Sequence, residues 1–386
     1  MKKYSISSKR VYLDFAASTP PDKAVVETVT EAGKFFANPS AQYESARKSK
    51  ELLNEARKEC AMFLQSKPEE IIFTSGATES NNIAIQGVAL SHQTGRIISI
   101  ATEHSSVKEP LNHLKELGYD VVYASISNKG LVDLDDFANL LNEDTVLVTI
   151  SYANSEIGVV QPITKISQII KAYNASRGCN VVFHSDASAG ALTFSCDVSR
   201  LGVDMLSLGG AKLYGPRSAG ILYKARGVEL KPIIYGGPQE NCLRPGTESV
   251  DMALGMAKAL GMIKERRKND GANFKKLHQL LFSELDSASI KYIYNGHPKD
   301  KIYNVANISL DGQNGEDLVA RLDALGFEVS TGAACEASSD EPSKTIMALG
   351  RTKSEAQGSL RISFGRTTSM DEIKRFVIAL SGIIRP

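Results

Sequence analysis

Short apolar runs alternate with amphipathic stretches through residues 68–225, and this rhythm constrains the fold more than any other feature of the chain. Helical patterns such as residues 106–117 and 163–175 lie between the apolar runs, and Gly118 and Gly178 mark their ends. Strand, helix, strand in this order predicts an α/β fold with a mainly parallel sheet covered by helices on both faces. The seven predicted strands are residues 70–75, 96–101, 120–125, 145–152, 180–186, 204–208 and 220–223.

The pattern changes after a long helical region, Val250–Ser287. Short strand-like runs and two further helices then predict a smaller α+β domain, against which the first 20 or so residues pack. We expect a large domain over residues 20–255 and a small domain made of residues 1–19 and 256–386. The runs in question are the strands 291–294, 305–310 and 360–364 and the helices 315–325 and 371–380.

Composition excludes several functional classes. With 386 residues, 42% of them hydrophobic, and a net charge of +1, the chain offers no electrostatic case for binding nucleic acid or a membrane. No apolar run approaches the roughly 18 residues of a transmembrane helix, and the basic N-terminus lacks the apolar segment of a secretory signal. Five scattered cysteines, with no C-x-x-C and no paired histidines, predict reduced thiols in a cytoplasmic protein and no metal site.

Polar residues follow several of the predicted strands, where parallel sheets carry their sites. The helix start at Gly76-Ala77-Thr78 suits a phosphate, although an ordinary N-cap explains it equally well. His104 follows the strand 96–101 and is compatible with a satisfied core group, ring stacking or proton transfer. Asp186 ends a buried apolar strand, so its carboxylate needs a partner, and a protonated pyridine nitrogen would serve.

Lys212 stands between an apolar strand and a Gly-Pro turn. It is either a surface lysine in a loop or an amine held in a cleft to form a Schiff base. A lysine, a strand-end aspartate, a strand-end histidine and a Gly-Ala-Thr helix start are together the parts that a pyridoxal phosphate site needs.

Over nearly its whole length the chain resembles the cysteine desulfurases, the NifS/IscS-like branch of the class V aminotransferases. The resemblance rests on residues 12–20, 38–40, 74–80, 102–104, 154–162, the segment around Lys212, residues 244–247 and residues 360–366. It implies fold type I of the pyridoxal-phosphate-dependent transferases and a homodimer with shared sites.

The resemblance also implies a role for individual residues. Lys212 would carry the cofactor, Asp186 would face its ring nitrogen and His104 would stack on its ring. Thr78, with the Ala77 amide, would hold the phosphate. The implied cofactor contacts are Lys212, Asp186, His104, Ala77, Thr78, Ser155, and Thr247 reaching the phosphate of the neighbouring subunit.

Arg361 and Asn154 are the implied substrate-binding residues, and a guanidinium suits the substrate carboxylate. Cys335, in a loop of small and polar residues, has the spacing of the family's nucleophile and joins Lys212 and His104 as catalytic. The implied reaction converts L-cysteine to L-alanine. The sulfur stays on Cys335 as a persulfide and passes to an acceptor protein, for iron–sulfur cluster assembly or tRNA thiolation.

The chain departs from the family pattern at several cofactor-contacting positions: Gly209, Ala211, Ala189, Ser155 and Tyr43 replace serine, histidine, glutamine, asparagine and histidine. Each hydrogen bond lost to a charged phosphate removes about 1.5–3 kcal/mol. The departures leave open another class V enzyme, such as a selenocysteine lyase or an aminotransferase. They also leave open a weakly active, partner-dependent or non-catalytic paralogue. The retained Cys335 and Arg361 favour a working desulfurase with weaker cofactor binding.

Overall fold

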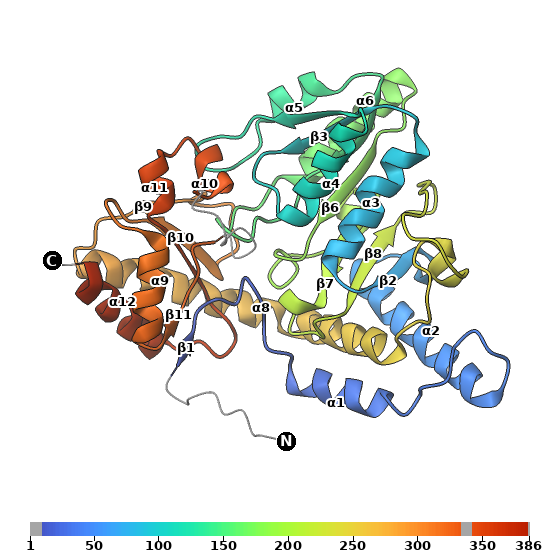
Figure 1. Cartoon of the computed structure of the whole chain (residues 1–386), viewed down its shortest axis with the longest axis horizontal. Helices are drawn as coiled ribbons and strands as arrows, with labels where there is room; N and C mark the ends of the chain where they lie inside the picture. The colour runs from blue at the N-terminus through green and yellow to red at the C-terminus, as the bar shows by residue number, and fades with distance from the viewer. Residues whose placement is uncertain (1–9, 333–341, 385–386) are drawn as a thin grey trace.

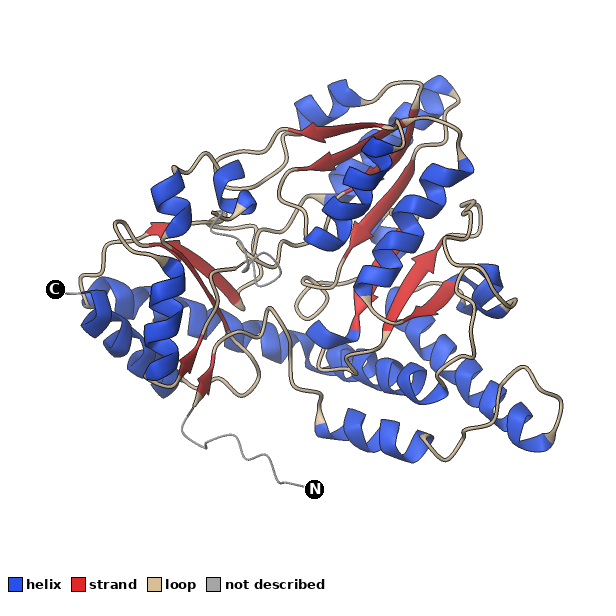
Figure 2. Ribbon diagram, viewed as in Figure 1, coloured by secondary structure: helices blue, strands red, loops and turns tan. Residues whose placement is uncertain are grey.

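A computed structural model of the chain describes residues 10–332 and 342–384. Its central element is a seven-stranded sheet with helices on both sides (Figures 1 and 2). In spatial order the strands are β2 (Ile71–Thr74), β8 (Gly220–Lys224), β7 (Met205–Gly209), β6 (Val182–Asp186), β5 (Thr145–Thr149), β3 (Arg96–Ile100) and β4 (Asp120–Ala124). The strands from β7 to β4 pair in parallel, and β8 runs antiparallel between β2 and β7. The predicted mainly parallel sheet is therefore confirmed.

Alternate residues of each strand enter different hydrophobic cores, which explains the nearly continuous apolar runs. Ile97 packs on one face with helices α3 (Ala77–Ser91) and α4 (Ser105–Glu116). Ile98 packs on the other face. The helices of that second face are α2 (Glu44–Leu64), α5 (Leu134–Leu140), α6 (Ile163–Arg177), α7 (Val198–Leu201) and the first part of α8 (Val250–Ser287). Burial of both faces is the expected environment of a parallel sheet.

The second part of the molecule has its own core. A three-stranded antiparallel sheet, in the order β12 (Ser359–Ser363), β10 (Val305–Ser309) and β9 (Ile293–Tyr294), packs with α9 (Gly315–Ala324) and α12 (Met370–Ile384). Strand β1 (Val11–Tyr12) pairs in parallel with β11 (Phe327–Glu328), so the N-terminal segment does pack here. Helix α8 contributes to both cores, and the predicted boundary at residues 255 and 256 falls inside it. The division into two domains stays a prediction.

The long helix α8 has the predicted bounds. Shorter elements complete the chain. They are α1 (Lys23–Ala32), α10 (Lys344–Ala348), α11 (Lys353–Gln357) and the 3₁₀ turns η1 (Pro68–Glu70), η2 (Gly210–Lys212) and η3 (Gln239–Cys242). In the described part of the chain, no helix is both long and apolar enough to cross a bilayer.

Candidate active site

One pocket lies where the carboxyl ends of the central strands face the smaller part of the molecule. Of the residues singled out from the sequence, its lining includes Lys212, Asp186, His104, Asn154, Ser155 and Arg361. Ala77, Thr78 and Thr247 are not among its lining residues, and Thr247 is exposed. Cys335 lies outside the described residues. The structure therefore brings together the predicted lysine, aspartate, histidine and arginine from four separate parts of the chain.

Asp186 ends β6 with its carboxylate buried and facing the pocket. Asn81 of α3 donates from Nδ2 to Oδ2 over 2.8 Å, and the main-chain N–H of Ser188 donates to Oδ1 over 2.9 Å. Burial acts to raise the pKa of Asp186, but these hydrogen bonds and the positive charge of Lys212 outweigh it and leave the pKa below its usual value. Asp186 is therefore an ionised carboxylate at neutral pH, ready to face a cation in the pocket.

His104 forms the N-cap of α4. Its Nδ1 accepts from the main-chain N–H of Ser106 over 3.1 Å and lies 2.9 Å from the Ser106 hydroxyl, so the ring is held at the pocket wall. Burial lowers the pKa of His104 to about 4, and the positive charge of Lys212 acts in the same direction. The imidazole is therefore neutral at physiological pH.

Lys212 ends the 3₁₀ turn η2, directly after β7. Thr19 fixes this turn from the N-terminal segment: its main-chain N–H and Oγ1 donate to the Ala211 carbonyl over 2.8 and 3.0 Å. The Tyr214 N–H donates to Thr19 Oγ1 over 2.7 Å. The lysine thus projects from a braced turn rather than from a loose surface loop.

The start of α3 carries the polar residues Thr78 and Glu79 in its first turn. No side chain caps the helix at Gly76. A Cβ atom on Gly209 would lie 3.0 Å from Ala77 Cβ and 3.1 Å from Ala77 N, which is closer than ordinary packing. Gly209 therefore permits β7 to approach the helix start closely.

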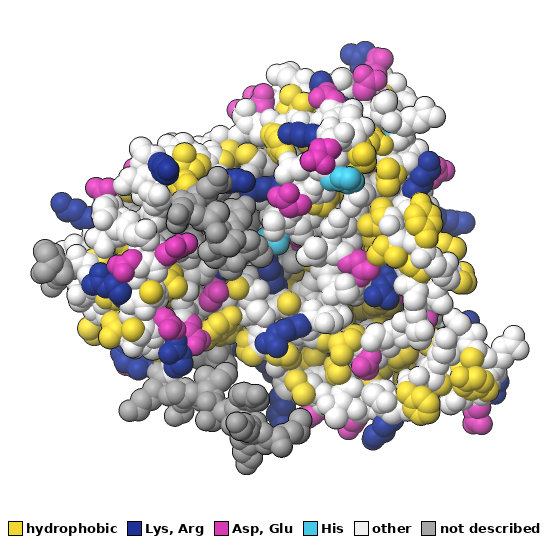
Figure 3. Space-filling model, in the orientation of Figure 1, with side chains coloured by type: hydrophobic (Ala, Val, Ile, Leu, Met, Phe, Trp, Pro, Cys, Tyr) yellow, Lys and Arg dark blue, Asp and Glu magenta, His cyan; other side chains and the backbone are white. Residues whose placement is uncertain are grey.

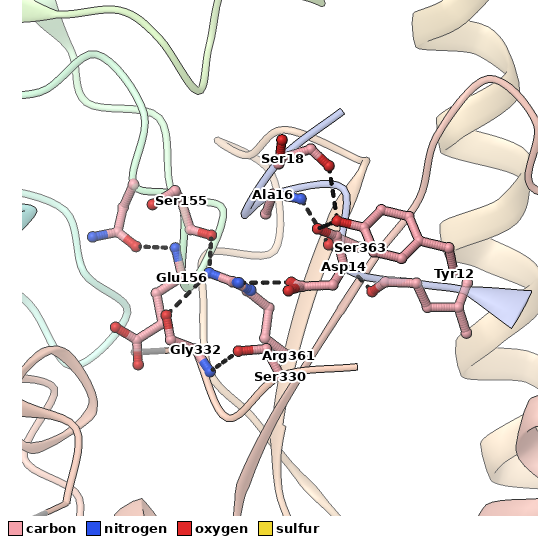
Figure 4. A network of polar contacts seen from close by, with 12 residues as sticks. Tyr12, Asp14, Ala16, Ser18, Ser155, Glu156, Ser330, Gly332, Arg361 and Ser363 are labelled. Carbon is pink, nitrogen blue, oxygen red and sulfur yellow. Dashed lines mark hydrogen bonds and ion pairs between the residues drawn. The ribbon is translucent and has the colours of Figure 1, made fainter. Parts of the chain in front are cut away.

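Arg361 of β12 is almost completely buried and closes the pocket on the side of the smaller core. Its Nη2 forms an ion pair with Asp14 Oδ1 over 2.7 Å. Its Nη1 donates to the carbonyls of Ser155 and Gly332 over 3.3 and 3.0 Å (Figure 4). Within the described residues, Nε has no hydrogen-bond partner. A buried guanidinium with a donor still available suits an anionic group entering the pocket.

Asn154 is less available to a ligand than expected. Its Nδ2 donates to the Thr102 carbonyl over 2.6 Å, and its Oδ1 accepts from the N–H groups of Glu156 and Ile157 over 2.8 Å each. These contacts build the turn that follows β5. A substrate contact from Asn154 stays a prediction.

Sequence reasoning missed two buried carboxylates in the pocket wall, Glu103 and Glu156. Burial raises the pKa of Glu103 to about 7, against opposing hydrogen bonds from Ser151. Burial also raises the pKa of Glu156, which accepts a hydrogen bond from the Ser343 hydroxyl. Both glutamates lie within segments on which the family resemblance rests. The position of Glu103 directly before His104 could have indicated from the sequence that it belongs to the site.

Comparison with known proteins identifies relatives over nearly the whole chain. Residues 11–376 match the family model described as aminotransferase class-V. A cysteine desulfurase IscS from Dictyoglomus turgidum is 38% identical over 97% of this chain and 95% of its own. A solved structure of a NifS-like protein superposes with a TM-score of 0.90 at 29% identity, covering 97% of this chain and 99% of that one. A structure of SspA in complex with cysteine superposes with a TM-score of 0.80 at 32% identity, covering 92% and 98%.

Proposed function

The chain belongs to the class-V aminotransferase family, and from this premise we propose that it is a cysteine desulfurase. The proposed reaction converts L-cysteine to L-alanine and keeps the sulfur on Cys335 as a persulfide until an acceptor protein takes it. The observation that carries the proposal is one pocket that combines an amine, Lys212, an ionised buried carboxylate, Asp186, and a buried arginine, Arg361. The substrate class is supported by the relatives named cysteine desulfurase.

The donor set fits pyridoxal 5′-phosphate. Lys212 would hold its carbonyl carbon, Asp186 its ring nitrogen and His104 one face of its ring. The N–H groups of Ala77 and Thr78 would hold its phosphate, because the start of α3 carries the positive end of the helix dipole and no side-chain cap. When bound, the cofactor would withdraw electrons from the Cα atom of an attached amino acid.

The protein's own residues would then handle protons and orientation. The Lys212 amine would take the proton from Cα and return one during product formation. Asp186, kept ionised by Asn81 and Ser188, would hold a positive charge on the ring nitrogen. Arg361 would bind the substrate carboxylate and hold Cα above Lys212.

Cys335 would supply the sulfur-accepting step. Its thiolate would attack the substrate sulfur, so that an S–S bond forms while the substrate C–S bond breaks. The electron pair of the broken bond passes to the substrate carbon, which takes up a proton and becomes the methyl group of alanine. The persulfide sulfur would then move to a thiol of the acceptor, in iron–sulfur cluster assembly or tRNA thiolation.

We also propose a cytoplasmic homodimer. The described cysteines, Cys60, Cys179, Cys196 and Cys242, are free, which suits a reducing compartment. Thr247 is exposed and does not line the pocket of its own subunit, as expected of a residue that binds the phosphate in a second subunit. Ser155 lines the pocket and would lie near the cofactor ring. Apolar side chains gather on the face seen in Figure 3 over the loop after β8 and near the start of α2. Phe36, before α2, and Tyr235, after β8, are 90% and 83% exposed.

Product analysis with the cofactor-loaded protein tests the proposed function. We expect L-cysteine and a thiol reductant to give L-alanine and sulfide in equal amounts. A keto acid in place of alanine would identify an aminotransferase, and the absence of any product would leave a non-catalytic paralogue. Selenocysteine as a competing substrate separates a selenocysteine lyase from a desulfurase.

A further inference from the structure

The guanidinium of Arg361 is fixed on two sides before any ligand arrives. Of its five N–H donors, two on Nη1 point at the carbonyls of Ser155 and Gly332, and one on Nη2 points at Asp14 (Figure 4). The main-chain contacts come from two separate loops, and Asp14 comes from the N-terminal segment. The plane of the guanidinium is therefore set by groups from three different parts of the chain.

The donors that remain form one edge of the guanidinium. Nε is buried without a partner among the described residues, and one proton of Nη2 is not used by Asp14. An edge made of Nε–H and an Nη2–H matches the two oxygens of a carboxylate. Arg361 lines the pocket, and this edge holds the guanidinium donors that have no partner among the described residues, so it is the edge that would meet a substrate carboxylate.

Asp14 is itself held tightly, although it does not line the pocket. The main chain of Asp14 forms an isolated parallel β-bridge with Ser363, the last residue of β12. The Ser363 N–H donates to the Leu13 carbonyl over 2.7 Å. The Tyr12 hydroxyl lies 2.9 Å from the Asp14 carbonyl (Figure 4). The carboxylate therefore stands behind Arg361 on a braced segment, where it contacts the arginine and not the substrate.

We propose that Asp14 is a positioning residue for substrate binding. Its carboxylate occupies one Nη2 proton of Arg361 and so directs the Nε edge at the carboxylate of an α-amino acid. This inference rests on the proposed function, because that function supplies the amino-acid substrate.

Two substitutions separate orientation from charge. Asp14→Ala removes the acceptor, so the guanidinium is free to rotate and the bidentate edge is lost for part of the time. Asp14→Asn keeps an oxygen acceptor in the same place and removes the repulsion between Asp14 and the substrate carboxylate. A role in positioning therefore predicts rescue by asparagine, whereas a requirement for charge does not.

The experiment measures KM and kcat for L-cysteine, and the Kd of L-alanine by calorimetry, in the cofactor-loaded protein. We expect Asp14→Ala to raise KM and the alanine Kd by about tenfold, the typical contribution of one well-placed charge-assisted contact, with kcat within threefold of the parent. Asp14→Asn should stay within threefold on every measure. Glu328→Gln is the matched control, because Glu328 of β11 pairs over 2.6 Å with Arg10, which lies on the same N-terminal segment as Asp14, and neither residue lines the pocket.

Unchanged KM and Kd in Asp14→Ala would overturn the proposal, as would equal losses in Asp14→Ala and Asp14→Asn. An equal loss in Glu328→Gln would also overturn it, since loosening of the segment would then explain the effect. If Asp14→Ala does not fold, Asp14→Ser, with a shorter side chain, takes its place. Failure of the proposed function looks different: the parent gives no alanine from cysteine, while the Kd of L-alanine still tests Asp14.

Discussion

The pocket around Asp186 and the nearby start of α3, where the cofactor phosphate would bind, are built in different ways. At Asp186, polar side chains make specific hydrogen bonds: Asn81 donates to the carboxylate, and His104 is fixed at the start of α4. At the start of α3, Gly209 packs against Ala77 and no side chain caps the helix. The groups that would control electrons and protons are therefore held by both side-chain and main-chain hydrogen bonds, whereas the phosphate would depend largely on main-chain amides. We therefore expect the chemistry to be retained and the binding of the cofactor to be weaker.

The largest effect is expected from Lys212→Ala. Loss of the amine removes both the covalent link to the cofactor and the base at Cα, so turnover of cysteine should fall by roughly 10²–10⁴-fold or more. The absorbance of the lysine-bound cofactor should vanish with it. Lys224→Ala is the control, because Lys224 is a partly buried lysine on β8 whose Nζ contacts the Val228 carbonyl instead of the pocket. Parental turnover in Lys212→Ala would show that this end of the pocket was misassigned.

Asp186→Asn is expected to have the next largest effect. The amide keeps the size of the side chain but removes the charge, so kcat should fall roughly 10- to 100-fold, the value of a charge-assisted contact. Asp204→Asn is a matched control, since Asp204 is also a carboxylate that accepts from a main-chain N–H of β6, that of Phe183, over 2.8 Å. If both variants lose activity equally, stability of the sheet and not the charge at the pocket explains the result.

Glu103 is a buried carboxylate of the same pocket, but its pKa moves in the opposite direction to that of Asp186. Burial raises the pKa of Glu103 from 4.5 to about 7. Between these two values the folded state binds more protons than the unfolded state, so the free energy of unfolding should decrease as pH rises through this window and level off above it. The difference corresponds to roughly 3 kcal/mol at most. Denaturant unfolding at pH 5 and pH 8 should show a flatter profile in Glu103→Gln than in the parent. Identical profiles would mean that Glu103 is ionised throughout.

The smallest expected effect concerns retention of the cofactor. Ala211→His adds a donor at a half-buried position and should slow loss of the cofactor during dialysis by about tenfold. Gly209→Ser is the matched partner and should bring no such gain, because its Cβ would crowd Ala77. If the parent already retains the cofactor tightly and Ala211→His does not change this, the expected weakness of phosphate binding relative to the contacts at Asp186 would be contradicted.

Much of the fold follows from the sequence because burial on both faces of a parallel sheet leaves unbroken apolar runs. The bounds of α8 were predicted to the residue, and the predicted strands of the central sheet agree to within three residues at each end. The antiparallel direction of β8 was not predictable, since a strand pattern reads the same both ways along the chain. Helix α1 was not predicted.

The site was predictable where a residue ends a strand. Asp186 ends β6, and Lys212 and His104 follow β7 and β3, so parallel pairing brings the three residues to one edge. Contacts between distant segments carried no such signal: nothing in the sequence pairs Asp14 with Arg361, which is 347 positions away. The use of the Asn154 side chain by its own turn was likewise not foreseen.

Mass spectrometry after brief treatment with L-cysteine tests the central claim most directly. The account predicts one added sulfur atom on the peptide that contains Cys335, and its loss in Cys335→Ser, with the cofactor spectrum unchanged. Cys242→Ser is the control, because Cys242 is the exposed thiol in the described part of the chain. An added sulfur on Cys242, or full sulfide release by Cys335→Ser, would contradict the account.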